Sequence, residues 1–150
     1  MARPRTCLSL MLIAALPFCI GAESYGDTSH VVPGPISAEL LRVIDGDTIE
    51  VRARIWLDLD LTTRVRLAGI DAPELNGGCA EERRLAGMAK LALTETLGSG
   101  PVWLADIRRD KYGGRVVAEV MLSDGRNASA TMLSSGVAAA WGSTPAWCAR

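Results

Sequence analysis

The stretch VRLAGIDAPE, residues 65–74, marks the point at which a predicted strand ends in a cluster of charges. Val65 and Leu67 alternate with polar neighbours, and this period of two predicts a strand with one buried face. Two acidic residues, Asp71 and Glu74, follow it on either side of a proline, which a central strand does not accommodate. The stretch is therefore either a plain strand exit that leads into a helix or a functional loop.

Upstream of this stretch, the chain has the pattern of a strand meander. From Ala38 onward apolar residues recur at every second position, with an interruption at Asp45-Gly46-Asp47. The alternation continues through LDLDL at residues 57–61, and Thr62-Thr63 follows. We expect bends at the Asp-Gly step and at the two threonines, and the leucines continue the alternation of the preceding strand.

Downstream, the period changes to that of a helix. Residues 79–97 are rich in helix-forming residues, and Gly98 suits a C-terminal cap. Two further strands are predicted at residues 102–107 and 116–122, followed by a short helix at 127–135 that begins with an asparagine cap. Five strands with a long helix between the third and fourth is the order of an OB-fold barrel, an α+β fold that is mainly β. Several other small α+β folds share this order.

The composition is that of one globular domain. The 150 residues are 49% hydrophobic and 22% charged, which excludes a mostly disordered chain. A formal net charge of −1 excludes a histone-like binder of polyanions. The single histidine, His30, excludes a two-histidine phosphodiester mechanism and a histidine-rich zinc site.

The first 22 residues predict a secretory signal peptide. Arg3 and Arg5 form its charged region, residues 7–20 form its apolar region, and Ala22 is the small residue before cleavage. The alternative is a helix of the protein core. We expect cleavage, and therefore a secreted or periplasmic protein.

Cleavage would leave a flexible leader at residues 23–37 and a domain at residues 38–150. The mature chain would carry 14 basic and 17 acidic residues, a charge of −3, and we expect it to be monomeric and not attached to a membrane. Its two remaining cysteines, Cys79 and Cys148, are an even pair in an exported chain and predict a disulfide. Two buried free thiols are the alternative.

Charges concentrate in three segments at predicted strand ends: IDGDT at residues 44–48, the stretch at 65–74, and DKYGGR at 110–115. Paired carboxylates, a third acid and two arginines suit metal-assisted phosphodiester hydrolysis. A hard cation prefers oxygen ligands, and phosphoryl transfer needs positive groups near the oxygens that gain charge. Taken singly, each segment also has an ordinary interpretation, such as a hairpin turn, an exposed strand arginine or a solvated charge after a Gly-Gly turn.

Together and in this order, the three segments resemble the thermonuclease, or staphylococcal nuclease-like, family. The resemblance covers about residues 38–142, and its middle motif is the most specific. It implies an OB-fold barrel and a calcium-dependent endonuclease whose substrates are DNA and RNA, with a preference for single strands. The alternative is a non-catalytic module on the same barrel that binds nucleic acid or protein.

The resemblance also implies a metal site. Asp47, Asp71 and the backbone carbonyl of Ala72 would be the calcium ligands, and Asp45 would act on the metal through water.

The same resemblance implies catalytic and substrate-binding residues. Glu74 would position or deprotonate the attacking water, while Arg66 and Arg115 would bind the phosphate and stabilise its developing charge. Lys111 and Tyr112 would contact the neighbouring phosphate or sugar.

Departures from the pattern of the family include Ala72, where the family often has threonine, and the absence of a third helix after Trp141. Two further departures bear on the substrate site. An extra glycine makes Gly114 and Arg115 compete for the position of the second arginine, and we favour Arg115 because glycine carries no charge. After the short helix, where the best-known member has tyrosines in its nucleotide site, this chain has AAAWG at residues 138–142. Trp141 is therefore either a platform for a base or a core residue.

Overall fold

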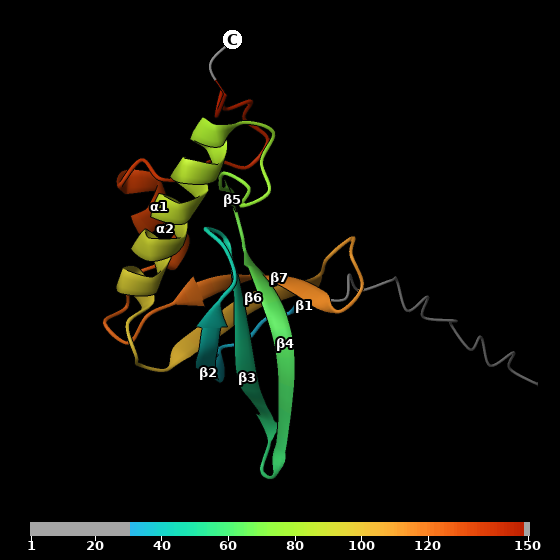
Figure 1. Cartoon of the computed structure of the whole chain (residues 1–150). Helices are drawn as coiled ribbons and strands as arrows, with labels where there is room; N and C mark the ends of the chain where they lie inside the picture. Colours follow the sequence, from blue (N-terminus) through green and yellow to red (C-terminus); the bar gives the residue numbers. More distant parts are fainter. Residues whose placement is uncertain (1–30, 149–150) are drawn as a thin grey trace, which may run out of the picture.

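The computed structural model describes residues 31–148 (Figure 1). The predicted signal peptide, His30 and the first part of the predicted leader lie outside these residues. Within the described part, no helix is long and apolar enough to cross a membrane.

Five strands close into a mixed barrel, which confirms the predicted OB-fold architecture. They are β2 (Ile36–Val43), β3 (Thr48–Trp56), β4 (Leu59–Leu67), β6 (Val102–Arg109) and β7 (Arg115–Met121). The pairings β2–β3, β3–β4, β6–β7 and β2–β6 are antiparallel, and β4–β7 is parallel. The parallel contact places β7 beside β4, and both strands carry residues of the predicted site.

Two helices and three short strands complete the fold. The helices α1 (Ala80–Leu97) and α2 (Ala128–Ser134) contact each other on one side of the barrel (Figure 1). The short strands are β1 (Val31–Val32), β5 (Ile70–Asp71) and β8 (Ala139–Ala140). Strand β4 ends within the stretch at residues 65–74, and α1 begins shortly after that stretch.

The helix ends lie where the sequence predicts them. Cys79 caps the start of α1 and accepts the amide N–H of Glu82 on its sulfur, and Gly98 closes the helix with a positive φ of 59°. Asn127 caps α2 and accepts the amide N–H of Ala130 on its side chain. Cys79 and Asn127 satisfy amide groups that have no partner inside a helix, so the starts of both helices follow from local chemistry.

The core fills the barrel and the space under the helices. It consists of aliphatic side chains from all five barrel strands and both helices, among them Ala38, Ile49, Val51, Val65, Leu67, Leu93, Val102, Leu104, Val120 and Met132. Burial of this apolar surface is the main stabilising contribution to the fold.

The predicted leader extends too far, because the barrel begins before Ala38. Val31 and Val32 pair with β6, and β2 begins at Ile36, which lies opposite Leu104. Glycine and proline around residues 33–35 break the side-chain alternation, but backbone pairing with β6 needs no such alternation. The leader therefore cannot extend beyond residue 30.

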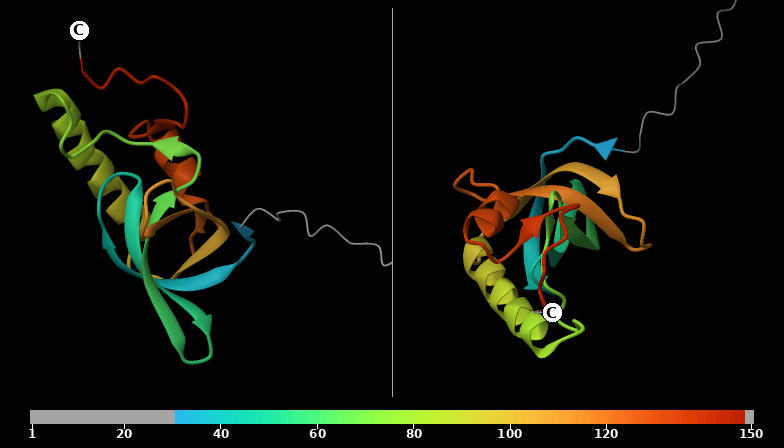
Figure 2. Two further views of the ribbon diagram at one scale, coloured as in Figure 1. Left: turned by 90° about the vertical axis from the view of Figure 1, so that its right-hand side faces the viewer. Right: turned by 90° about the horizontal axis from the view of Figure 1, so that it is seen from above.

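The predicted bend at Thr62-Thr63 is also wrong. Both threonines lie within β4, opposite Arg52 and Val51, and the turn of the hairpin is at Leu57-Asp58. Threonine is β-branched and suits an extended strand. As a result the β3–β4 hairpin is longer than predicted, and it projects beyond the barrel (Figure 2).

Gly46 lies where the loop between β2 and β3 packs against α1. A Cβ atom at this position would lie 2.6 Å from the Cβ of Ala89 and 2.8 Å from the Cβ of Ala72. Only glycine fits so close an approach, and the loop carries Asp45 and Asp47 on either side of it.

We therefore expect Gly46→Ala to lower the free energy of unfolding by about 1–3 kcal/mol, the usual range for overpacking. Urea unfolding followed by circular dichroism measures the change. Gly87→Ala is the matched control, because a Cβ at Gly87 on α1 meets no atom within 4 Å and alanine favours the helix. Equal stability of wild type and Gly46→Ala would show that the loop does not require this contact.

Candidate functional site

Arg66 lies at the centre of the predicted site. Its Nη1 atom donates to Oδ1 of Asp47 at 2.8 Å, and its Nη2 atom donates to Oδ1 of Asp71 at 2.6 Å. Nη2 also lies 3.4 Å from the carbonyl oxygen of Ile70. One guanidinium group therefore joins the start of β3 to β5, and both expected metal carboxylates converge on it.

Asp47 is buried, with 4% of its surface exposed. Besides Arg66, its carboxylate accepts the hydroxyl of Thr48 at 2.8 Å and the amide N–H of Ala72 at 3.1 Å. Burial raises the pKa of Asp47 to about 6; the nearby charge of Asp45 adds to this rise, and Arg66 and the two hydrogen bonds oppose it. The site thus holds a carboxylate that is poorly solvated and favours a positive partner.

Asp45 shapes the loop and does not contact Arg66 through a hydrogen bond. Its Oδ1 atom accepts the amide N–H of Asp47 at 3.1 Å, which is the pattern of an Asx turn. Its side chain lines a hollow of about 240 Å³ next to Thr48 and Arg115.

An open cavity of about 600 Å³ brings together most of the predicted catalytic and substrate-binding residues. Those that line it are Arg66, Asp71, Glu74, Lys111, Tyr112, Arg115 and Trp141. Asp47 and Ala72 are both buried, and they do not line it.

Two charged cavity residues received no role from the sequence, Arg108 and Asp110. Arg108 lies opposite Val117 on β7, and Val117 lies opposite Arg66 on β4, so the two arginines flank one residue in adjacent strands. This arrangement depends on closure of the barrel, which places β7 between β4 and β6. Asp110 belongs to the motif DKYGGR, and its carboxylate forms an ion pair with Arg115.

The structure places Arg115 rather than Gly114 in the cavity. Gly114 has a φ of 76° in the turn before β7, and Arg115 is the first residue of the strand. The guanidinium carbon of Arg115 lies 5.1 Å from the ring centroid of Tyr112. Burial disfavours the charge on Asp110, but hydrogen bonds from Arg115 and from the amide of Lys111 outweigh it and lower the pKa of Asp110.

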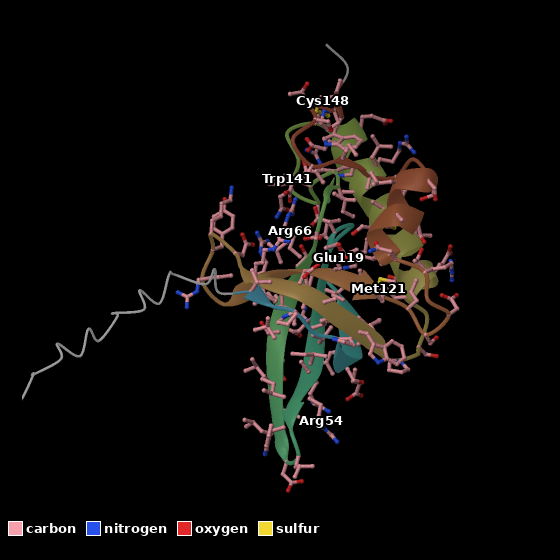
Figure 3. The ribbon with its side chains drawn as sticks, turned by 180° about the vertical axis from the view of Figure 1, so that it is seen from behind. Arg54, Arg66, Glu119, Met121, Trp141 and Cys148 are labelled. Atoms are coloured by element: carbon pink, nitrogen blue, oxygen red, sulfur yellow. A yellow bond between two sulfur atoms is a disulfide. The ribbon has the colours of Figure 1, made fainter. Side chains whose placement is uncertain are left out.

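Trp141 is a surface residue, and the alternative of a core tryptophan is excluded. Its side chain is 60% exposed, and its ring centroid lies 4.9 Å from the guanidinium carbon of Arg66 (Figure 3). Its amide N–H donates to the carbonyl of Gly69 at 3.0 Å, next to the pairing of β8 with β5. The segment after α2 thus returns to the strand end that carries Asp71.

A disulfide between Cys79 and Cys148 anchors that segment, as predicted, and excludes the alternative of two free thiols. The two Cα atoms are 6.0 Å apart and the cysteines are 69 residues apart in the sequence. A link across a loop of this length contributes about 4 kcal/mol in the chain-entropy model. It connects the start of α1 to the end of the described chain.

Comparison with known families agrees with this geometry. A sequence model described as staphylococcal nuclease homologue matches residues 64–146, more than half of the chain. The chain belongs to this family. It is also 34% identical over 112 residues to an uncharacterized endonuclease of Escherichia coli, and equally identical to an uncharacterized endonuclease of Escherichia coli O157:H7. Each alignment covers 74% of this chain and 63% of the relative, so the chain spans less than two thirds of these proteins.

The oxygen donors of this staphylococcal nuclease homologue fit a hard divalent cation. Asp47 and Asp71 direct carboxylate oxygens at one positive group, and the backbone of Ala72 is held beside them by its hydrogen bond to Asp47. Two carboxylates and one carbonyl leave positions for water and for a phosphate oxygen, which suits the six to eight ligands of calcium.

A second candidate group of ligands does not fit a metal. Within residues 31–148, three ligand atoms of acidic, histidine or cysteine side chains gather within 4.8 Å only at Cys79, Glu82 and Cys148. Its two sulfur atoms are bonded to each other, so they are not available as thiolates.

The raised pKa of Asp47 predicts a pH dependence of stability in metal-free protein. Between about pH 4 and pH 6 the unfolded chain releases this proton and the folded chain retains it, so stability falls as pH rises. Asp47→Asn removes this titration. We therefore expect the stability of the variant relative to wild type to increase by roughly 1–3 kcal/mol over this range.

Urea unfolding from pH 4 to 7 in a chelating buffer measures the difference between the two proteins, in which titrating groups that do not interact with Asp47 cancel. A difference that stays constant with pH would show that Asp47 titrates normally.

Proposed function

We propose that the chain is a calcium-dependent endonuclease that hydrolyses phosphodiester bonds in DNA and RNA and prefers single strands. The observation that carries the proposal is the position of Arg66. Its guanidinium is held by Asp47 and Asp71 at the wall of a cavity that also contains Arg115 and Glu74. Family membership and the endonuclease relatives support the same chemistry.

The two arginines bind the phosphate in this proposal. Their planar guanidinium groups match phosphate oxygens, and they stabilise the negative charge that grows on these oxygens in the transition state. Asp47 and Asp71 restrain Arg66, and Asp110 with the ring of Tyr112 restrains Arg115. Both groups are therefore positioned before substrate arrives, which reduces the reorganisation needed in the reaction.

Asp47, Asp71 and the carbonyl of Ala72 would hold the calcium ion, with Asp45 acting through water. When bound there, calcium would polarise the phosphoryl group and favour attack by water.

Glu74 is the proton acceptor in the proposal. It is exposed and lines the same cavity as the two arginines. Its carboxylate takes one proton from water, the water oxygen forms a bond to phosphorus, and the bond from phosphorus to the leaving oxygen breaks. The leaving oxygen keeps the electron pair of that bond and takes up a proton from the surrounding water.

The remaining cavity residues suit an unpaired strand. Tyr112 and Trp141 expose aromatic rings on which separated bases can stack, and Lys111 lies beside Tyr112 to contact a neighbouring phosphate. The cavity is lined by four basic side chains against three acidic ones, although the whole chain has a net charge of −1. The local charge thus favours a polyanion where the overall charge does not.

We further propose that the protein acts in the periplasm or outside the cell. The predicted signal peptide supports this, and so does the disulfide, because disulfides persist in oxidising compartments.

Digestion of heat-denatured DNA tests the function. Every described element lies between Val31 and Cys148, so a chain that begins at Glu23 contains the whole barrel. We expect cleavage with calcium and none with a chelator. Arg66→Ala should lower kcat by about 100- to 1,000-fold, and Glu74→Gln by about 100- to 10,000-fold.

Two matched variants control for general effects of charge loss. Arg126→Ala removes an exposed arginine that pairs with Asp124, and Glu81→Gln removes an exposed carboxylate that pairs with Arg84 on α1. Both should cleave as fast as wild type. Folded wild-type protein that binds denatured DNA without cleaving it under either condition would instead identify a binding module.

A further inference from the structure

The β3–β4 hairpin extends well beyond the barrel (Figures 1 and 2). Strand β2 pairs with β3 only as far as Ala53, and β7 pairs with β4 only from Arg64 onward. We call residues 54–63 the hairpin arm. In the arm β3 and β4 pair only with each other, so both of its faces lie outside the five-stranded wall.

One face of the hairpin arm is ionic. Arg54 and Asp60 lie opposite each other and form an ion pair at 2.8 Å (Figure 3 labels Arg54). Closer to the barrel, a similar pair joins Arg52 to Glu39 at 3.1 Å. The charges on this face pair with one another, so the face is suited to contact with water.

The other face of the arm is apolar and uncovered. Leu61 lies opposite Ala53, which is in the core, so this face continues the inner wall of the barrel. Further out Trp56 lies opposite Leu59, and Leu57 forms the turn. Trp56 is 73% exposed and Leu57 is 79% exposed. Such a contiguous apolar patch on a monomer of this size indicates an interaction surface.

A hollow lies at the foot of the same face. It has a volume of about 470 Å³, and Thr63 of the hairpin arm forms part of its wall. Val32, Ile107 and Val116 contribute apolar side chains. The lining also includes Arg109, and it shares Arg108, Tyr112 and Arg115 with the substrate cavity. Within the described residues, Arg109 forms no ion pair with a carboxylate.

We propose that the hairpin arm is the dimerisation surface of the protein and that its occupant is the arm of a second copy. The two arms lie antiparallel across a two-fold axis with their apolar faces together. Each tip, with Trp56 and Leu57, enters the hollow at the foot of the other arm. Asp58 at the tip then lies near Arg109 of the second copy. A two-fold axis makes both halves of this contact identical, so each tip finds a hollow.

The charge distribution along the arm favours this antiparallel arrangement. The tip carries Asp58, and the region at the foot carries Arg108 and Arg109. Opposite charges therefore meet when the arms run in opposite directions, and like charges meet when they run in the same direction. The acidic tip is also unsuited to insertion into a lipid bilayer, because burial of a carboxylate there is costly.

The area of the patch is sufficient for a dimer. The exposed side chains of Ile55, Trp56, Leu57, Leu59 and Leu61 offer apolar surface on the order of 500 Å² per chain. Two arms and two hollows together would bury on the order of 1,200 Å² or more, the lower limit of standard protein interfaces.

This proposal replaces the expectation of a monomer. In the sequence, the leucines at 57, 59 and 61 have the alternation of a strand that faces the core. In the structure no element of the described chain covers them, and a second copy supplies the missing cover. The hollow shares Arg108, Tyr112 and Arg115 with the proposed substrate cavity, so association is measured in the absence of nucleic acid.

Analytical ultracentrifugation of the chain that begins at Glu23 tests the proposal. We expect a monomer–dimer equilibrium between about 1 and 100 µM. Trp56→Lys should weaken association by about 30-fold or more, the effect of losing one central contact residue. Leu91→Lys is the matched control, because Leu91 is a 65% exposed leucine on α1, and it should associate like wild type. Circular dichroism and thermal unfolding establish that all variants are folded.

A charge exchange tests the antiparallel arrangement itself. Asp58→Arg and Arg109→Asp should each weaken association, and the double variant should recover it at least in part. A folded wild type that stays monomeric throughout this range would overturn the proposal, as would equal dimerisation of wild type and Trp56→Lys. Monomeric wild-type protein that binds phosphatidylcholine vesicles through Trp56 would assign the arm to a bilayer instead, and also overturn it.

Discussion

The contact between the buried carboxylate of Asp47 and the guanidinium of Arg66 is the interaction on which the candidate site depends. Asp47 also holds Thr48 and the amide of Ala72, and Arg66 holds Asp71, so two side chains join three segments of the chain. A carboxylate that is 4% exposed is unfavourable without such partners. The same poor solvation makes the pair suited to receive a cation or a phosphate. The burial that makes this carboxylate costly for the stability of the fold therefore also makes it able to bind a ligand.

The loop and the chain end that support this pair are held by close packing and by a covalent link. Gly46 lets the loop of Asp45 and Asp47 approach α1 until no Cβ would fit. At the other side, β8 pairs with β5, and the disulfide to Cys79 holds the segment that carries Trp141. Because rigid supports hold both sides, the charged groups converge in a fixed arrangement, which favours preorganised binding of a phosphate.

Local patterns in the sequence predicted much of this structure. The strand alternation, the caps Gly98 and Asn127, and the disulfide all depend on neighbours in sequence or on a unique pairing. The errors occurred where a neighbouring strand decides the outcome. Residues 31–37 join the sheet through backbone pairing with β6. The leucines of LDLDL at residues 57–61 face no core, because the β3–β4 hairpin extends beyond the barrel. Alternation shows that a strand has an apolar face, but it does not show what covers that face.

By itself, the sequence determined the fold class, the family resemblance and the types of residue in the candidate site, because periodicity, capping chemistry and ordered motifs are local properties. Only the tertiary structure decided which charges pair, that Arg108 and Asp110 join the cavity, and that Trp141 is exposed beside Arg66. Closure of the barrel is the physical reason. It brings β7 parallel to β4 and returns the chain after α2 to β5, and these contacts span distances in sequence that no local pattern encodes.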